Sequence, residues 1–304
     1  MNLTAIQSKA GGTFAPRTMY RRSGGVWVPV TGGEALTGPN GTPLLDNFNR
    51  ADQPLTAQWM NPQPDPSRWL PTAAAGSGGI NTISSQRAHQ DNYGINDALT
   101  NWATPFSVEA GQGVEVWCEW VQFPSEEPQG SYFPFLNPLV LRVGSYFEEP
   151  GPHGPSGAID GDIRPYTLLV GRPSADNENW WDDSVNGGWI VLGAGTNQSG
   201  SIGSIDAFET KTDPIPATVA EGDTWALSVE IAPDPDERTL RAWRRPADGE
   251  WSEVSNWTTP KPTAMTSNPD ELDVGHIGFG LCGPAQIQDP LPIIDNFGGG
   301  EFPA

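Results

Sequence analysis

Basic residues, cysteines and long apolar runs are all scarce in this sequence. Only 16 of its 304 residues are Lys or Arg, against 37 Asp and Glu, which gives a formal net charge of −21. Phosphate backbones attract basic protein surfaces, so this charge predicts that nucleic acid is not a partner. No stretch approaches the roughly 20 apolar residues that cross a bilayer, so membrane insertion is not expected either.

Two cysteines are too few for a disulfide framework. Cys118 and Cys282 each lie within a strand-like pattern, which predicts two buried free thiols. Residues 1–9 lack the apolar core of a secretory signal peptide. Together these features predict a protein that is made and assembled in the cytoplasm.

Glycine and proline, in contrast, are abundant, with 36 and 31 copies. Both residues mark turns, and no segment shows a sustained helical spacing of apolar residues. A period of two is clear at 114–123 and again at 224–231, as in half-buried strands. In the first of these segments, one face is expected to carry Val114, Val116, Cys118 and Trp120, and the other Glu115, Trp117 and Glu119. The sequence therefore predicts an all-β protein.

Further strands separated by Gly/Pro turns are indicated at 80–83, 86–90, 139–143, 166–170, 189–192, 238–244 and 276–281. Many short strands of this kind favour a β-sandwich over alternating strands and helices. Long loops are expected at 124–137, 148–164 and 172–187. They would project from the ends of the sandwich, where binding loops usually lie.

A five-residue pattern occurs near each end of the chain. Residues 44–48 read Leu-Leu-Asp-Asn-Phe and residues 293–297 read Ile-Ile-Asp-Asn-Phe. In a strand the first, third and fifth side chains of such a segment share one face. We expect the two segments to be the first and last strands of one body, lying side by side and antiparallel. Trp59 is expected to return an aromatic ring to the core after the first strand.

Residues 1–42 differ from the rest of the chain in charge. They hold four basic residues and one acidic residue, a balance of +3, which leaves −24 for the remainder. The pattern around Gly24-Gly25 predicts a strand-turn-strand that is too small to be stable alone. A docking arm for an acidic neighbour, such as another copy of the chain, and a basic disordered tail both fit.

The segment Leu45–Asp52, followed by Trp59, resembles the opening of concanavalin A-like jelly-roll domains of the laminin-G and glucanase type. Segments 222–243, 275–280 and 294–297 extend this resemblance to about residues 43–300. It implies a jelly-roll sandwich over 43–304 whose first and last strands are neighbours, preceded by an arm over 1–42.

Residues 15–30 are similar to N-terminal arms of phage minor tail proteins, which often carry a Gly-Gly-x-Trp-x-x-Val piece. The resemblance implies a structural virion protein, assembled in the host cytoplasm and oligomeric in the tail beside other tail proteins. Arg21, Arg22 and Trp27 are the residues expected to anchor the arm. The jelly roll would contact the host envelope, with a cell-surface glycan as the expected ligand.

The sharpest candidate contact site lies in the 172–187 loop and consists of Asn179, Trp180, Trp181, Asp182 and Asp183. Aromatic rings pack against the C–H faces of sugars, and amides or carboxylates bind sugar hydroxyls. Contact with a neighbouring protein subunit, or packing of the tryptophans beneath the loop, would equally explain this composition.

Glucanases of this fold carry three carboxylates on one strand face, in a Glu-x-Asp-x-Glu pattern. Here Glu115 and Glu119 share a face, but Trp117 replaces the middle carboxylate. At ~3.3 Å per residue the two glutamates lie ~13 Å apart along the strand, beyond the ~9.5 Å limit of an inverting pair. We therefore predict a polar outer face and no catalytic residue. Glycoside hydrolase and free-standing soluble lectin are kept as alternative functions.

Metal sites and cofactors receive little support. Calcium takes oxygen ligands, and Asp160-Gly161-Asp162 and Asp182-Asp183 supply carboxylates but follow no established loop spacing. Solvated acidic turns are the alternative for both. His89, His153 and His276 are isolated from one another, so no zinc site is expected. We predict no bound metal and no cofactor, with calcium left open.

Overall fold

The structure, a computed structural model, shows only β-strands, turns and loops in the part of the chain that it describes. The described residues are 19–23, 26–30, 36–48, 53–54, 59–60, 81–84, 87–90, 98–102, 104, 106–107, 111–122, 136–145, 166–172, 188–195, 208–231, 236–261, 274–281 and 293–303. Within them, no helix is long and apolar enough to cross a membrane.

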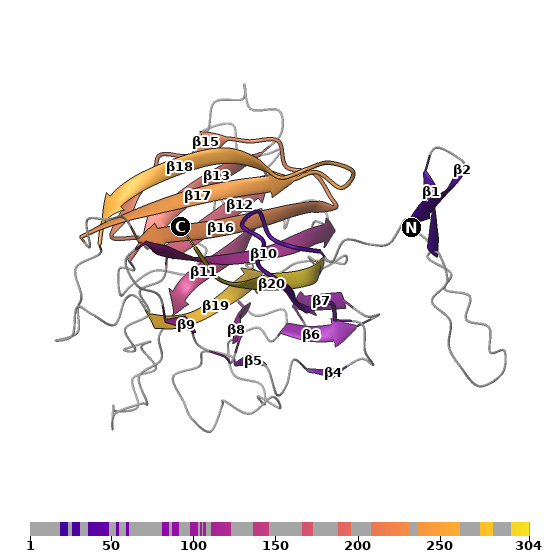
Figure 1. Cartoon of the computed structure of the whole chain (residues 1–304), viewed down its shortest axis with the longest axis horizontal. Helices are drawn as coiled ribbons and strands as arrows, with labels where there is room; N and C mark the ends of the chain where they lie inside the picture. Colours follow the sequence, from indigo (N-terminus) through magenta and orange to yellow (C-terminus); the bar gives the residue numbers. More distant parts are fainter. Residues whose placement is uncertain are drawn as a thin grey trace.

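Most described strands belong to two nine-stranded sheets, which lie one behind the other in Figure 1. Sheet 1 has the order β18 (Ser252–Pro260), β17 (Glu237–Arg245), β16 (Asp223–Ile231), β10 (Gln112–Gln122), β20 (Ile293–Pro303), β7 (Arg87–Gln90), β6 (Asn81–Ser84) and β4 (Gln53–Pro54), with β3 (Leu44–Asp46) also paired to β20. The pairings between its described strands are all antiparallel.

Sheet 2 is antiparallel as well. Its order is β14 (Thr210–Lys211), β13 (Trp189–Ala194), β12 (Tyr166–Arg172), β11 (Leu136–Ser145), β19 (Val274–Leu281), β8 (Ala98–Trp102) and β5 (Trp59–Met60), with β15 (Ile215–Pro216) on β13 and β9 (Phe106–Ser107) on β19. The chain passes repeatedly between the sheets, as from β10 to β11 and from β19 to β20. Two packed antiparallel sheets with such crossings confirm the predicted jelly-roll fold class.

The core lies between the sheets and follows the predicted alternation. Val114, Val116, Cys118 and Trp120 of β10 all belong to one buried apolar cluster. Sheet 2 contributes every second residue of its central strands to the same cluster, including Leu139, Leu141, Val143, Leu168, Val170, Ile190 and Leu192. The faces assigned from the period of two are therefore confirmed for β10.

The two copies of the Asp-Asn-Phe pattern lie side by side, as predicted. β3 pairs antiparallel with β20, placing Asp46 opposite Phe297. Trp59 is buried and its ring packs against Phe48 and Phe297, with centroid distances of 5.8 and 4.7 Å. The Trp59 indole N–H also donates to the Asp46 carboxylate over 2.8 Å. The first strand, the last strand and the returning tryptophan thus form one unit.

Seven described strands were not predicted, namely the five-residue β8, the edge strand β18, and the two-residue strands β4, β5, β9, β14 and β15. β18 is an edge strand whose residues are mostly exposed or half-buried, so its sequence shows no strict alternation. The predicted N-terminal hairpin is present: β1 (Met19–Ser23) and β2 (Val26–Val30) pair antiparallel. They form their own two-stranded sheet and pair with no other strand among the described residues.

Candidate functional site

A short N-terminal segment crosses the outer face of sheet 1 and connects the arm to the body. We call residues 36–43 the strap; Figure 1 shows it in indigo over β10 and β20. Its ends meet in an isolated bridge between Thr37 and Pro43. The Gly41 N–H donates to Gly38 O (3.0 Å), closing a turn in which Gly41 has a φ of +83°. This positive φ favours glycine at the turn.

Two backbone carbonyl groups of the strap accept hydrogen bonds from the body. The Gly299 N–H of β20 donates to Pro43 O over 3.0 Å. The indole N–H of Trp251, in the β17–β18 turn, donates to Thr37 O over 3.0 Å. Because Thr37 and Pro43 bridge to each other, these contacts hold the base of the strap to β20 and to the β17–β18 turn. The strap belongs largely to the region assigned to the arm, whose boundary at residue 42 stays a prediction.

Glu115 of β10 lies beneath the strap and is fully buried, with 0% of its surface exposed. Its carboxylate accepts hydrogen bonds from the Asn40 side-chain amide and from the Thr42 hydroxyl, each over 2.5 Å. The Asn40 backbone N–H lies 3.3 Å from the same carboxylate. Burial raises the pKa of Glu115 to about 7, and the hydrogen bonds from Thr42 and Asn40 oppose that rise.

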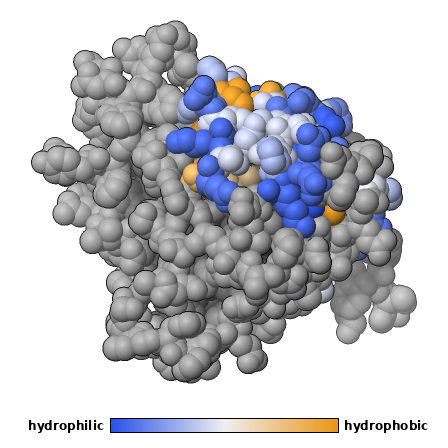
Figure 2. Space-filling model, turned by 90° about the vertical axis from the view of Figure 1, so that its left-hand side faces the viewer, coloured by the Kyte–Doolittle hydropathy of each residue, from blue (hydrophilic) through white to orange (hydrophobic). Residues whose placement is uncertain are grey.

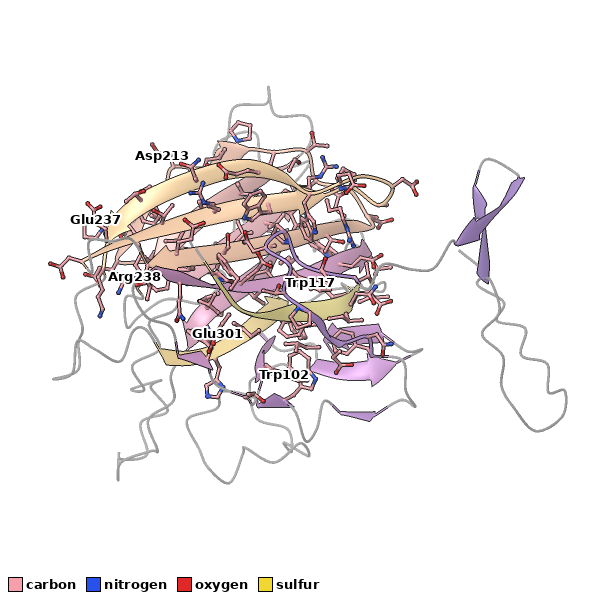
Figure 3. The ribbon with its side chains drawn as sticks, in the orientation of Figure 1. Trp102, Trp117, Asp213, Glu237, Arg238 and Glu301 are labelled. Carbon is pink, nitrogen blue, oxygen red and sulfur yellow. The ribbon has the colours of Figure 1, made fainter. Side chains whose placement is uncertain are left out.

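Trp117, the next outward residue of β10, is also fully buried (Figure 3). Its indole N–H donates to the Thr42 hydroxyl over 3.2 Å. Gly38 and Gly298 permit the close packing around the indole. A Cβ at either position would overlap Trp117, and a Cβ at Gly298 would also lie 2.6 Å from Pro43 O. The two glycines thus let the strap and β20 approach the ring.

The prediction of a polar, solvent-facing outer face for β10 was wrong. Glu115 and Trp117 do point away from the core, but the strap covers both of them. Glu119 is half-buried and accepts a hydrogen bond from the Asn296 side chain over 2.7 Å. With the strap in place Glu115 cannot reach a substrate, so these two glutamates do not form an accessible acid–base pair.

The remainder of the outer face of sheet 1 lacks such a cover in the described part of the chain. We define the open face as Glu230, Arg241, Trp243, Glu253 and Asn256 on β16, β17 and β18, with the buried Ser228 beneath Trp243. The Arg241 guanidinium pairs with Glu230 (3.0 Å) and Glu253 (2.9 Å), and these three side chains are 24–30% exposed. The Trp243 indole N–H donates to the Ser228 hydroxyl over 2.8 Å. An aromatic ring therefore lies within a set of ordered polar groups.

Two charged groups of the open face have perturbed ionisation. The hydrogen bond from Asn256, followed by that from Arg241, lowers the pKa of Glu253. The hydrogen bond to Glu230 raises the pKa of Arg241. Both shifts keep the ion pair charged across the ordinary pH range.

At the left-hand end of the body in Figure 1, the described surface is mostly hydrophilic with small apolar spots (Figure 2), so no large apolar patch is visible there.

Sequence reasoning missed both the strap contact and the open face. Glu230, Arg241 and Trp243 occupy alternate positions of two paired strands, so their common face could have been read from the pattern. The strap offered no such signal, because its sequence of Gly, Pro, Thr and Asn has no period.

The predicted contact loop lies outside the described residues, as do the acidic segments 160–162 and 182–183 considered for calcium. Asn179, Trp180, Trp181, Asp182 and Asp183 therefore stay a prediction. Arg21 and Arg22 lie on β1 and Trp27 on β2, with Arg22 directly opposite Trp27 in the hairpin register.

Three remaining predictions concern thiols and metals. Cys118 is a buried free thiol, as predicted, and burial raises its pKa; Cys282 lies outside the described residues. His276 is half-buried with Nδ1 2.8 Å from Trp102 O, and burial lowers its pKa. Within the described ranges no three His, Cys, Asp or Glu side chains are grouped so that they could hold a metal ion.

No protein-family model matches the sequence, and no curated protein matches it. Several solved structures are similar to the chain. Lectin II from Ulex europaeus is 11% identical with a TM-score of 0.39, over 74% of this chain and 91% of that one. The potassium-bound Emp46p carbohydrate recognition domain is 12% identical with a TM-score of 0.42, over 86% and 96%. A peanut lectin is 10% identical with a TM-score of 0.39, over 74% and 89%. The fold assignment above rests on the strand order.

Proposed function

We propose that this chain is a structural component of a phage tail, which attaches through its N-terminal hairpin and presents its sandwich to host-surface glycan. The observation that carries the proposal is the pairing of the hairpin. β1 and β2 pair with each other and with no other described strand. A lone two-stranded hairpin is marginally stable in water, so a partner surface would complete it.

Charge supports an acidic partner for the arm. Residues 1–42 carry +3 while the rest of the chain carries −24, so the arm attracts an acidic neighbour and the body repels other acidic bodies. Arg21 and Arg22 lie on one strand of the hairpin. A tail protein with an acidic docking face, or the body of another copy, fits this distribution.

The contacts of the strap support the proposal that the arm is a tether through which force reaches the body. Its contacts with Gly299 and Trp251 join the end of the arm to β20 and to the β17–β18 turn. A pull on the arm would therefore act on the centre of sheet 1 rather than on a surface loop. Such a connection suits a protein that must hold its body on a particle.

The test is a truncation that separates the arm from the strap, together with substitutions within the arm. Removal of residues 1–35 keeps the strap, so the body should fold and should fail to enter virions. The double variant Arg21→Glu/Arg22→Glu should also be excluded from virions, whereas Lys9→Glu, a change of arm charge outside the hairpin, should be incorporated. Immunogold labelling of purified particles should mark the tail end. Incorporation of the 1–35 truncation at the level of the full chain would refute docking through the arm.

A free-standing lectin is the second candidate, and the open face favours it. Trp243 and its polar neighbours lie on a sheet surface that the described residues leave accessible. The 1–35 truncation should then bind glycan as well as the full chain does. In a glycan array, loss of binding in Trp243→Ala would assign the contact to the open face. Loss in Trp180→Ala or Trp181→Ala would assign it to the 172–187 loop.

A further inference from the structure

The contacts of Glu115 run almost entirely to the strap. Among the described residues, its three hydrogen-bond donors belong to Asn40 and Thr42. The strap itself contains no charged residue, so nothing in it neutralises an ionised Glu115. The strap therefore covers a carboxyl group without supplying a counter-charge.

The described residues of neighbouring strands do not supply a counter-charge either. On the outer face of sheet 1 the described charged side chains are Glu119 on β10, Asp295 opposite it on β20, Glu230 on β16, Glu237, Arg241 and Arg245 on β17, and Glu253 on β18. Arg241 pairs with Glu230 and Glu253, and Arg245 stacks on Trp251 at 5.2 Å. Among the described residues, no cation makes a hydrogen bond to Glu115.

We propose that Glu115 is a proton-operated latch: in its neutral form it holds the strap closed on β10, and its ionisation releases the strap and with it the base of the N-terminal arm. A hydroxyl both donates and accepts, so Thr42 can bond either form of the carboxyl group. The neutral form meets these polar partners without a buried charge. The ionised form is stabilised by leaving the site for water.

The direction of the effect follows from the proton affinities of the two states. Burial beneath the strap raises the pKa of Glu115 to about 7, whereas an open strap returns the group to water and to its ordinary value. The closed state therefore binds the proton more tightly, and rising pH favours opening. The difference between 4.5 and about 7 corresponds to a change in the opening equilibrium on the order of 100-fold between pH 5 and pH 8.5.

Hydrogen–deuterium exchange of the full chain tests the latch. After correction for the intrinsic pH dependence of exchange, protection of the strap should fall on the order of 100-fold from pH 5 to pH 8.5. Peptides from β16 and β17 should stay more strongly protected than the strap at every pH, because they exchange only when the whole sheet opens. Glu115→Gln, which keeps the shape and cannot ionise, should give a protected strap at every pH. The matched control Glu119→Gln changes a half-buried glutamate on the same face and should behave like the wild type.

Three outcomes would overturn the proposal. One is strap protection in the wild-type chain that does not change with pH, a result that needs no variant and so stands even if Glu115→Gln does not fold. Another is an unchanged pH dependence in Glu115→Gln. The third is a strap protection equal to that of β16 and β17 at every pH, which would mean that the strap opens only when the whole protein unfolds. None of these results bears on whether the arm docks on a tail, because the truncation assay measures that separately.

Discussion

Replacement of Asp46 by alanine should be among the most destabilising single changes in the body. The carboxylate of this buried residue accepts the Phe48 N–H over 2.7 Å and the Trp59 indole N–H over 2.8 Å. Alanine would leave both buried donors unsatisfied, at about 1–3 kcal/mol each. We expect a total loss of about 3 kcal/mol in the free energy of unfolding, since some water will enter the gap. Urea titration followed by tryptophan fluorescence measures this loss.

The second copy of the pattern provides a matched control. Asp295 is half-buried, and its carboxylate accepts a hydrogen bond from the adjacent Asn296 N–H over 2.8 Å. Because water can reach this half-buried site, Asp295→Ala should lower the free energy of unfolding by less than Asp46→Ala does. Asp46→Asn, which keeps one acceptor oxygen, should fall between the two. If Asp46→Ala and Asp295→Ala destabilised the protein equally, the reasoning from buried donors would be refuted.

Three further predictions concern sheet 1. Gly298→Ala should cost about 1–3 kcal/mol because its Cβ would overlap Trp117, while Gly249→Ala in an exposed turn should change stability by less than about 0.5 kcal/mol in the same titration. The pKa of Glu115 is raised in the folded state, so the contribution of this group to the free energy of unfolding should be complete below about pH 4.5. It should fall by about 3 kcal/mol as pH rises through 7. Glu115→Gln should remove this part of the pH dependence in thermal melts at several pH values. Arg241→Ala should cost only about 0.5–1 kcal/mol, because its two ion pairs are partly exposed, and a loss above about 2 kcal/mol would contradict this.

Much of the fold could be predicted because the information was local. The period of two in β10 and β16 identified their core faces, and the repeated Asp-Asn-Phe pattern identified the neighbours β3 and β20. The edge strand β18 was missed because its sequence does not alternate strictly between apolar and polar residues, and most of its residues are exposed or half-buried. The outcome depended on whether the apolar residues of a strand alternate in its sequence.

The environment of Glu115 could not be predicted for a different reason. A glutamate that alternates with core residues normally faces solvent. Here the cover comes from Asn40 and Thr42, which are 75 and 73 positions away in sequence. No periodicity connects the two segments, and the glycines that permit the contact resemble ordinary turn residues. Long-range burial of this kind is visible only in three dimensions.

The position of β20 has a consequence for how the chain acquires its fold. β20 lies between β10 on one side and β3 and β7 on the other, yet it follows all of them in sequence. During synthesis the edge of β10 that pairs with β20 stays unpaired until β20 has been made, and unpaired strand edges promote aggregation. The Thr37–Trp251 contact spans 214 positions, and closure of such distant pairs is slow. Fragments that end before β20 should therefore aggregate, and chains shortened from the C-terminal side should keep β20 through Pro303.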